Sequence, residues 1–372
     1  MPKVTFKNNP SLFYDFLRSE VDSYFKEKRI RKTGNWKLFL KTGILIPCAI
    51  LIYVFLLAHH GSSFETILIS GLFGFILASI GFNIMHDACH GSYSSNKKIN
   101  EIFGLTMNAL GGNAFIWKQK HNIVHHTYTN IDGMDDDIAK SPLIRMCQTQ
   151  KWFPIHRVQH LYLPLVYSIT TIAWTFLTDF MKYFSGKVVS TGIKNMSRKE
   201  HLIFWISKIL CAGVYILLPL FLKGWLFWLL FFTSMHLVFG LTLAFVFQLA
   251  HVVEHTEFEV AKATDPTTIE KEWAVHQIKT TSNFAMNNSI ISWFVGGLNF
   301  QVEHHLFPRV SHVHYPAISK IVRSACQSYG LPYHQFPSMG SAVISHFRLM
   351  KQLGRKPFGS VQLQRETQPA VS

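Results

Sequence analysis

The sequence predicts an all-α integral membrane protein with four transmembrane helices, arranged as two hairpins, and a cytoplasmic helical cap. Three observations lead to this fold class. Of the 372 residues, 48% are hydrophobic and only 15% are charged, whereas charged residues make up about a quarter of a soluble protein. Four apolar runs have the length that crosses a bilayer. Lys and Arg collect on one side of these runs, which assigns that side to the cytoplasm.

The four apolar runs define the predicted transmembrane helices, and each is close to the roughly 20 residues that a bilayer core requires. The links at 59–63 and 223–224 are short enough to make each pair a helical hairpin. We place the transmembrane helices at about 38–58, 64–85, 203–222 and 225–250. They belong to one membrane domain, 38–350, between an N-terminal arm, 1–37, and a tail, 351–372, whose polar composition predicts disorder.

Charge gives the predicted orientation. Basic residues crowd the arm and the 118–201 segment, while the two hairpin links carry almost none. The positive-inside rule therefore places both termini and the central segment in the cytoplasm. The formal net charge of +15 suits a lipid bilayer with anionic headgroups, a phosphate-bearing substrate or an acidic protein partner. No basic segment belongs to a known nucleic-acid-binding module, so nucleic acid is not an expected partner.

Three further segments are expected to lie at the cytoplasmic membrane surface. In the arm, Phe13, Phe16, Val21 and Tyr24 are spaced as on an amphipathic helix. The stretches 102–117 and 161–184 are apolar but interrupted, and we interpret both as interfacial or partly embedded helices. The five scattered cysteines form no CxxC pair, which indicates reduced core residues. No cleavable signal peptide is predicted, because the first forty residues contain no apolar core.

Histidines recur in four groups at the predicted cytoplasmic ends of the helices. Spacings of three or four residues put the members of a group on one helix face, and several helices of a bundle can present ligands to one metal site. Imidazole binds iron, copper and zinc. The groups are His86 and His90; His121, His125 and His126; His251 and His255; and Gln301, His304 and His305. The sequence therefore predicts one histidine-rich dimetal site in the cytoplasmic cap.

Two iron ions fit this ligand set best. So many nitrogen ligands exceed the needs of one zinc ion, and no thiolate is placed to favour copper(I). A single histidine pair is more often a surface or core feature, but four groups with shared spacing and sidedness favour metal ligation. Ordinary structural roles are assigned to His59, His60, His156, His160, His236, His312 and His314, while the role of His276 stays open.

Acidic residues near the histidines are candidates for orienting imidazole N–H groups, a common role of carboxylates around a metal site. Those inside the groups are Asp87, Glu254 and Glu303. The three aspartates at 135–137 have two interpretations. They orient imidazoles in the same way, or they form an exposed turn.

Three of the motifs resemble the histidine boxes of membrane fatty acid desaturases. They are HDACH at 86–90, HNIVHH at 121–126 and QVEHH at 301–305. Gln at the start of the third box is similar to the front-end and linoleoyl-CoA-type subgroup. The resemblance implies a diiron centre that uses O2 and two electrons to introduce a cis double bond into a fatty acyl chain. It implies either an acyl-CoA or a lipid-linked substrate and does not fix the carbon attacked.

The resemblance also implies roles for individual residues. The expected metal ligands are His86, His90, His121, His125, His126, His304 and His305. His251 matches a histidine that relatives carry at the end of the fourth span, whereas His255 is matched less regularly. Gln301 occupies a ligand position, and three alternatives stay open for it: it binds the metal directly, it binds the metal through a water molecule, or it does not bind the metal.

Many relatives carry a fused cytochrome b5 domain with a His-Pro-Gly-Gly motif, which the N-terminal arm lacks. A separate electron donor is therefore expected, either a cytochrome b5 or a ferredoxin, steered by the basic cytoplasmic face. We expect the acyl chain to lie in a narrow apolar tunnel, because the reaction needs a dry site. The tunnel candidates are Phe115, Trp117, Trp273 and Phe300, with Arg309 and Lys320 as headgroup contacts. Ordinary packing and a solvated basic face remain alternatives for these residues.

Two other functions compete with desaturation. A histidine-rich diiron acyl hydroxylase or alkane monooxygenase would use the same metal site but form an alcohol. A non-enzymatic membrane protein that binds metal or haem would need ligands facing each other in the middle of the bilayer, whereas these groups lie at one end of the predicted helices.

Overall fold

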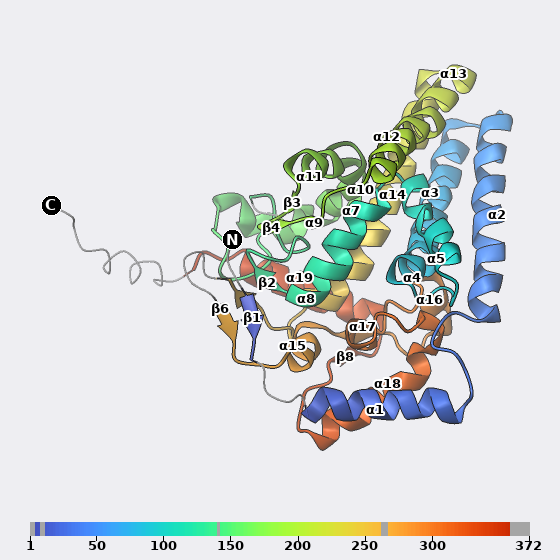
Figure 1. The fold of residues 1–372 in the computed structure, drawn as a ribbon. Helices are drawn as coiled ribbons and strands as arrows, with labels where there is room; N and C mark the ends of the chain where they lie inside the picture. Colours follow the sequence, from blue (N-terminus) through green and yellow to red (C-terminus); the bar gives the residue numbers. More distant parts are fainter. Residues whose placement is uncertain (1–3, 8–11, 140–141, 262–266, 358–372) are drawn as a thin grey trace.

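The computed structural model describes residues 4–7, 12–139, 142–261 and 267–357, and these residues are predominantly helical (Figure 1). Among them, four helical segments are long and apolar enough to cross a membrane. They are Trp36–Ala58, Ser63–His90, Arg198–Lys223 and Trp225–His251. The prediction of a mostly helical protein with four candidate membrane spans is confirmed. The bent pair Pro154–Ser168 and Thr170–Ser185, which turns by 57°, would add a fifth span if it crosses as one unit.

The first two spans begin at side-chain caps. Helix α2 (Trp36–Ala58) starts where the Asn35 side chain accepts a hydrogen bond from the backbone N–H of Lys37. Helix α3 (Ser63–Ile80) starts with a capping box between Ser62 and Glu65. Such caps satisfy N–H groups that the first helical turn leaves free. A link of four residues, 59–62, therefore separates two well-defined helices that pack against each other.

Helix α14 (Trp225–His251) is the central helix, packed against α3 and against α9 (Gln159–Ser168) (Figure 1). Two glycines allow these close contacts. A Cβ atom on Gly74 would lie 2.2 Å from the Met235 carbonyl oxygen, and one on Gly240 would lie 2.3 Å from that of Ser168. Any side chain at either position would push the helix backbones apart.

Short helical elements follow the spans and join them. After α3 come η1 (Gly81–Met85), α4 (His86–His90), α5 (Lys97–Gly104), α6 (Thr106–Ala109), α7 (Ala114–Lys118), η2 (Gln119–His125) and α8 (His126–Tyr128). The bent segment contains η3 (Pro154–Val158), α9, α10 (Thr170–Ala173), η4 (Trp174–Thr178) and α11 (Asp179–Ser185). The third span is α12 (Arg198–Ala212), η5 (Gly213–Leu217) and α13 (Leu218–Lys223).

The C-terminal region covers one end of the spans (Figure 1). It contains α15 (Trp273–Thr280), α16 (Ser289–Phe294), α17 (Gln301–Leu306), η6 (His312–His314), α18 (Tyr315–Ser328) and α19 (Met339–Leu353). Three two-stranded sheets in the described structure tie distant segments together, and a fourth is a local hairpin. The first three pair β1 (Val4–Phe6) with β6 (Thr267–Ile269), β2 (Ile131–Asp132) with β5 (Glu259–Val260), and β7 (Asn283–Phe284) with β8 (Gln335–Phe336); the hairpin pairs β3 (Lys187–Val188) with β4 (Thr191–Gly192). All but β3–β4 are parallel. Helix α19 extends three residues into the predicted tail, and 358–372 lie outside the described residues.

The N-terminal arm forms helix α1 (Leu12–Glu27), which packs on α18. Its buried face consists of Phe13, Leu17, Val21 and Phe25, at a strict spacing of four residues. The predicted face was therefore wrong at Phe16, whose side chain is 40% exposed. It was also wrong by one residue at its C-terminal end, where Phe25 and not Tyr24 is buried. A stripe at four-residue spacing follows one helix face, which leaves residue 16 at the rim.

Replacement of Leu17 by alanine is expected to lower the free energy of unfolding by about 2–5 kcal/mol, as for other buried leucines. Leu17 has no exposed surface, whereas Leu12 on the same helix is 73% exposed. Thermal unfolding of the detergent-purified protein would measure the change, with Leu12→Ala as the matched control. Equal effects of the two substitutions would mean that α1 is not docked on α18.

Candidate metal centre

Two π-helical turns present the first two histidine motifs. Turn η1 runs directly into α4, which carries His86 and His90, and turn η2 carries His121 and His125 and runs into α8, which begins at His126. A π-helical turn holds an additional residue and is frequent at functional sites. His251 is the last residue of α14, and His304 and His305 lie on α17. Elements far apart in the sequence thus supply the imidazoles.

These histidines are buried and close together. Within each of three groups, one side-chain nitrogen per histidine lies within 4.8 Å of those of the other members. The groups are His86, His90, His121 and His304; His125, His251 and His305; and His126, His304 and His305. Since His304 and His305 belong to two groups each, the eight histidines form one continuous set, which we call the histidine cluster. His121 and His125 also form a fourth group with Asp137.

Six cluster imidazoles have a buried Nε2 atom for which the described part of the chain supplies no hydrogen-bond partner. They are His90, His125, His126, His251, His304 and His305. Leaving a buried polar atom unpaired costs about 1–3 kcal/mol, so six at one place require an explanation. Metal ions would bind these lone pairs, and the donor set therefore fits the group that the sequence predicted.

Burial keeps most of these imidazoles neutral. It lowers the pKa of His121, His126, His304 and His305 well below the usual value for histidine, and neighbouring imidazoles add to the effect. A neutral ring has a free nitrogen lone pair, which metal binding requires.

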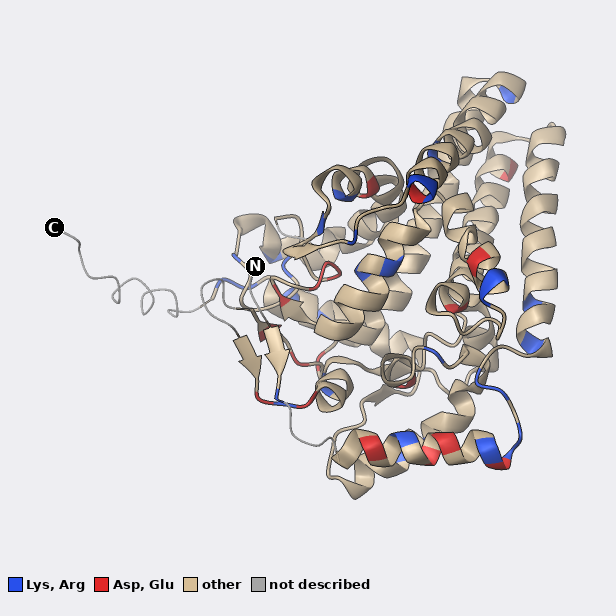
Figure 2. Cartoon of the chain, viewed as in Figure 1, with Lys and Arg blue, Asp and Glu red and all other residues tan. Residues whose placement is uncertain are grey.

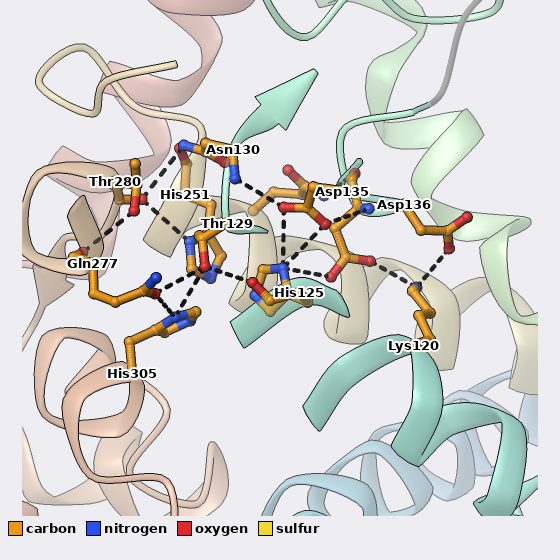
Figure 3. A network of polar contacts seen from close by, with 12 residues as sticks. Lys120, His125, Thr129, Asn130, Asp135, Asp136, His251, Gln277, Thr280 and His305 are labelled. Atoms are coloured by element: carbon orange, nitrogen blue, oxygen red, sulfur yellow. Dashed lines mark hydrogen bonds and ion pairs between the residues drawn. The ribbon is translucent and has the colours of Figure 1, made fainter. Parts of the chain in front are cut away.

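His125 is held by a carboxylate. Its Nδ1 lies 3.1 and 3.2 Å from the two oxygens of Asp135 (Figure 3). Burial acts to lower the pKa of His125, but the Asp135 carboxylate holds it above its usual value. Asp135 has no exposed surface and also accepts a hydrogen bond from the backbone N–H of Asn130 at 2.9 Å. Of the two interpretations of the aspartate run, imidazole orientation is therefore the one that Asp135 supports.

Neutral groups hold three other cluster imidazoles at Nδ1. His305 Nδ1 lies 2.8 Å from Gln277 Oε1, and His304 Nδ1 lies 3.0 Å from the Tyr315 hydroxyl. His251 Nδ1 lies 3.3 Å from the carbonyl oxygen of Thr280. With Nδ1 directed at the protein, Nε2 of each ring is left for a metal, as is usual for histidine ligands.

Asn130 fixes the turn after the second motif. It has a left-handed backbone, with φ of 55°, a conformation that asparagine tolerates better than most residues. Its side-chain amide donates to the carbonyl oxygens of His251 at 2.7 Å and Thr280 at 3.4 Å (Figure 3). His276, whose role was open, has Nε2 2.8 Å from the Thr129 carbonyl oxygen. It anchors the same turn and belongs to none of the groups.

An apolar pocket begins beside the histidine cluster. Trp117 lines it and stacks on His121, with ring centroids 4.3 Å apart, and Phe247 approaches His121 to 6.1 Å. The other lining residues are Gly81, Phe82, Met85, Met107, Leu110, Thr171, Trp174, Thr175, Phe239 and Leu243. The pocket therefore extends from the cluster between η1, η4 and α14.

Comparison with known proteins identifies the family. The fatty acid desaturase model matches residues 62–337. The chain belongs to the fatty acid desaturase family. The desaturase is 34% identical to the sn-1 linoleoyl-lipid 6-desaturase of Synechocystis sp. over 92% of this chain and 96% of that protein. It is 33% identical to the acyl-lipid (8-3)-desaturase of Physcomitrium patens over 93% of this chain and 72% of that protein. Similarity also extends to a probable Delta(5) fatty acid desaturase of Dictyostelium discoideum, 29% identical over 92% of this chain and 76% of that protein.

The predicted family and its front-end or linoleoyl-type subgroup are thus confirmed, as is the prediction of an oxidoreductase that desaturates fatty acyl chains. The four candidate spans and the family make the desaturase an integral membrane protein. The competing interpretation as a non-enzymatic metal- or haem-binding protein does not agree with membership of this family.

The structure brings most of the predicted ligands together and separates one. His255 is exposed and lies in none of the groups; its ring stacks on those of His334 and Phe336. Helix α14 ends at His251, so the two histidines do not share a helix face as their spacing suggested. Gln301 is buried one turn before His304, and its Oε1 has no hydrogen-bond partner.

Two of the three acidic candidates bind other groups in the described structure, and the third is exposed. Glu303 accepts hydrogen bonds from Tyr333 and Asn283, and burial raises its pKa to about 7. Asp87 accepts from the Ser311 hydroxyl at 2.6 Å, and Glu254 is exposed. No hydrogen bond to a cluster imidazole is found for any of them among the described residues. Sequence spacing gave no signal for the groups that do hold imidazoles, Gln277 and Tyr315.

The predicted substrate contacts are divided in the same way. Trp117 lines the pocket, but Phe115, Trp273 and Phe300 do not. Trp273 donates from Nε1 to the carbonyl oxygen of His126 at 3.0 Å, which fixes the backbone of a cluster residue. Phe300 belongs to the core between α1 and α18, and Arg309 is exposed.

Proposed function

We propose that the desaturase holds two iron ions in the histidine cluster and introduces a cis double bond into a lipid-linked fatty acyl chain, using O2 and two electrons from a separate donor. The observation that carries the proposal is the set of six buried, unpartnered Nε2 atoms. The names of the Synechocystis and Physcomitrium relatives, which specify acyl-lipid substrates, favour a lipid-linked chain over acyl-CoA.

The grouping of the imidazoles favours two ions. One would be held by His86, His90, His121 and His304, and the other by His125, His251 and His305. His126 lies between the two sets, near His304 and His305, and Gln301 is a further candidate on the same helix. Imidazoles without thiolates suit iron. Bound iron would activate O2, the oxidant that removes two hydrogens from an unactivated acyl chain.

The protein's own part is to orient the ligands, hold the chain and exclude water. Asp135, Gln277 and Tyr315 fix the rings from behind. The apolar pocket would receive the part of the chain beyond the reacting carbons. Its lining residues Phe239 and Phe247 are eight positions apart on α14, roughly 12 Å at 1.5 Å per residue. Trp117 and Phe247 would keep water from the side of the cluster that meets this chain.

We propose that the helices form two hairpins and that the termini and the dimetal site lie in the cytoplasm, with the C-terminal region as a cap. Charged residues are sparse along α2, α3 and α14, whereas residues of both signs alternate along α1 (Figure 2). The net charge of +15 favours an acidic electron donor, a cytochrome b5 or a ferredoxin.

Product analysis tests the proposed reaction. The protein would be expressed with a competent electron donor in a desaturase-deficient microbe, and double-bond positions would be read by mass spectrometry in the lipid and acyl-CoA fractions. A new cis double bond that appears first in lipids is expected. A hydroxylated product would point to the diiron hydroxylase alternative, and a double bond that appears first in acyl-CoA would overturn the lipid-linked substrate.

Replacement of Asp135 by asparagine is expected to weaken metal binding by about 10- to 100-fold, the usual effect of losing a partner of a ligating histidine. The amide keeps the size of the carboxylate but loses the charge that supports His125. Competition with a metal chelator would measure the change. Asp15→Asn on the surface of α1 is the control, and an unchanged affinity in Asp135→Asn would contradict the assignment of His125 as a ligand.

A further inference from the structure

A buried chain of polar groups lies beside the histidine cluster and contains none of its members. It begins at Lys41, on the first span, whose side chain is only 7% exposed. Lys41 Nζ donates to Asn83 Oδ1 at 2.8 Å and to the Trp293 carbonyl oxygen at 3.1 Å, and lies 3.1 Å from His312 Nε2. A cation at this depth is costly and tends to be functional.

The chain ends at Asp87, between the two histidines of the first motif. His312 Nδ1 lies 3.1 Å from Asp87 Oδ2, the oxygen that also accepts from the Ser311 hydroxyl. Burial lowers the pKa of His312, so its ring is neutral at pH 7. Because an ammonium group can only donate, we assign the ring proton to Nδ1, facing Asp87. The imidazole thus lies between the buried Lys41 ammonium and the buried Asp87 carboxylate, whose Oδ2 accepts hydrogen bonds from the Ser311 hydroxyl and, at 3.3 Å, from the backbone N–H of His312.

These contacts connect three segments that are distant in the sequence. Lys41 belongs to α2, Asn83 to the π-helical turn before the first motif, and His312 to the segment after the third motif. Asn83 also donates to the Phe294 carbonyl oxygen at 2.9 Å. Helix α4, which carries His86 and His90, has only five residues. It is the last part of the continuous span Ser63–His90, after the π-helical turn that contains Asn83, so contacts at this end of the span help to set its orientation.

We propose that Lys41 and His312 are positioning residues of the metal centre, which act through Asp87 to hold His86 and His90 against the rest of the cluster. The inference rests on the proposed two-iron site. His86 and His90 supply two of the four imidazoles of the first set and none of the second, His125, His251 and His305. Loss of the chain therefore releases one metal position and leaves the other.

The test compares iron content per folded chain in four variants of the full-length protein, purified in detergent as a monodisperse fraction. Lys41→Met and His312→Leu break the chain. His312→Gln retains a donor and an acceptor on a side chain of comparable reach. Lys208→Met is the matched control, since Lys208 is equally buried on another span and binds Asp179 and the carbonyl oxygens of Gly111 and Thr175. Mössbauer spectra of protein grown on ⁵⁷Fe would resolve the remaining iron.

We expect about one iron per chain in Lys41→Met and His312→Leu, with the spectrum of one site retained, and close to two in His312→Gln and Lys208→Met. Two irons with the wild-type spectrum in both chain-breaking variants would overturn the proposal. So would equal iron loss in Lys208→Met, or the same loss in His312→Gln as in His312→Leu. Wild-type protein without two irons would instead overturn the proposed function itself, before any variant is compared.

Discussion

Replacement of His304 by alanine is expected to abolish desaturation and to release iron from the first metal position. His304 is one of the four imidazoles of the first set, and it also lies in the group with His126 and His305 between the two sets, so its loss disrupts the centre where the two sets meet. The loss of activity should exceed the roughly 100-fold upper range seen for residues behind a ligand. Product formed per folded chain, together with iron content, would measure the effect.

The matched control is His156→Ala. His156 is also buried, but its ring lies near the Pro142 carbonyl oxygen and the Phe153 N–H, outside the cluster. This variant should keep both irons even if it is less stable. Normal activity of His304→Ala would contradict a catalytic role for the cluster.

The second large effect is expected from Gly81→Leu in the wall of the pocket. Gly81 has an ordinary right-handed helical backbone, and a Cβ atom there would lie 3.5 Å from Leu110 Cδ1 and 3.8 Å from Leu243 Cδ2. The added Cβ atom therefore fits without strain, and the remaining atoms of the leucine side chain would occupy the pocket. Turnover of a long acyl chain should fall by at least about 10- to 200-fold, the range for a change of one methylene group in an apolar pocket, while a chain short enough to end before Gly81 is spared.

Gly43→Leu makes the same change on the first span, where no atom of a neighbouring described segment lies within 4 Å of the added Cβ. It should leave the chain-length profile unchanged. Competition between fatty acids of different lengths in the same cells would measure both profiles. An unchanged profile in Gly81→Leu would mean that the acyl chain does not enter this pocket.

Helix-scale features of this protein were predictable because they repeat along the chain. Continuous apolar runs marked the four candidate spans, and spacings of three or four residues marked His86 with His90 and Gln301 with His304 and His305. The same spacing failed at His255, because the argument requires a continuous helix and α14 ends at His251. Residue spacing also assigned Phe16 wrongly to the buried face of α1. Two overlapping sets of apolar residues could form that face, and packing against α18 decides which of them is buried.

Contacts between distant segments left no such pattern. Gln277 and His305 are 28 residues apart, and Lys41 and His312 are 271 apart. Nothing in the local sequence distinguishes His312 from a surface histidine, and it was assigned an ordinary structural role for that reason. Asp135 was the partial exception, because a run of three aspartates near a histidine motif suggested a role in orientation. Partners of metal ligands are set by the folded arrangement and therefore had to come from the structure.

The most direct measurement is the metal content of the purified wild-type protein, by elemental analysis together with its visible spectrum. Two irons per chain, with no haem absorption and little zinc or copper, are the expected result. One metal per chain, a predominance of zinc, or a haem Soret band would contradict the proposal that the histidine cluster is a diiron centre.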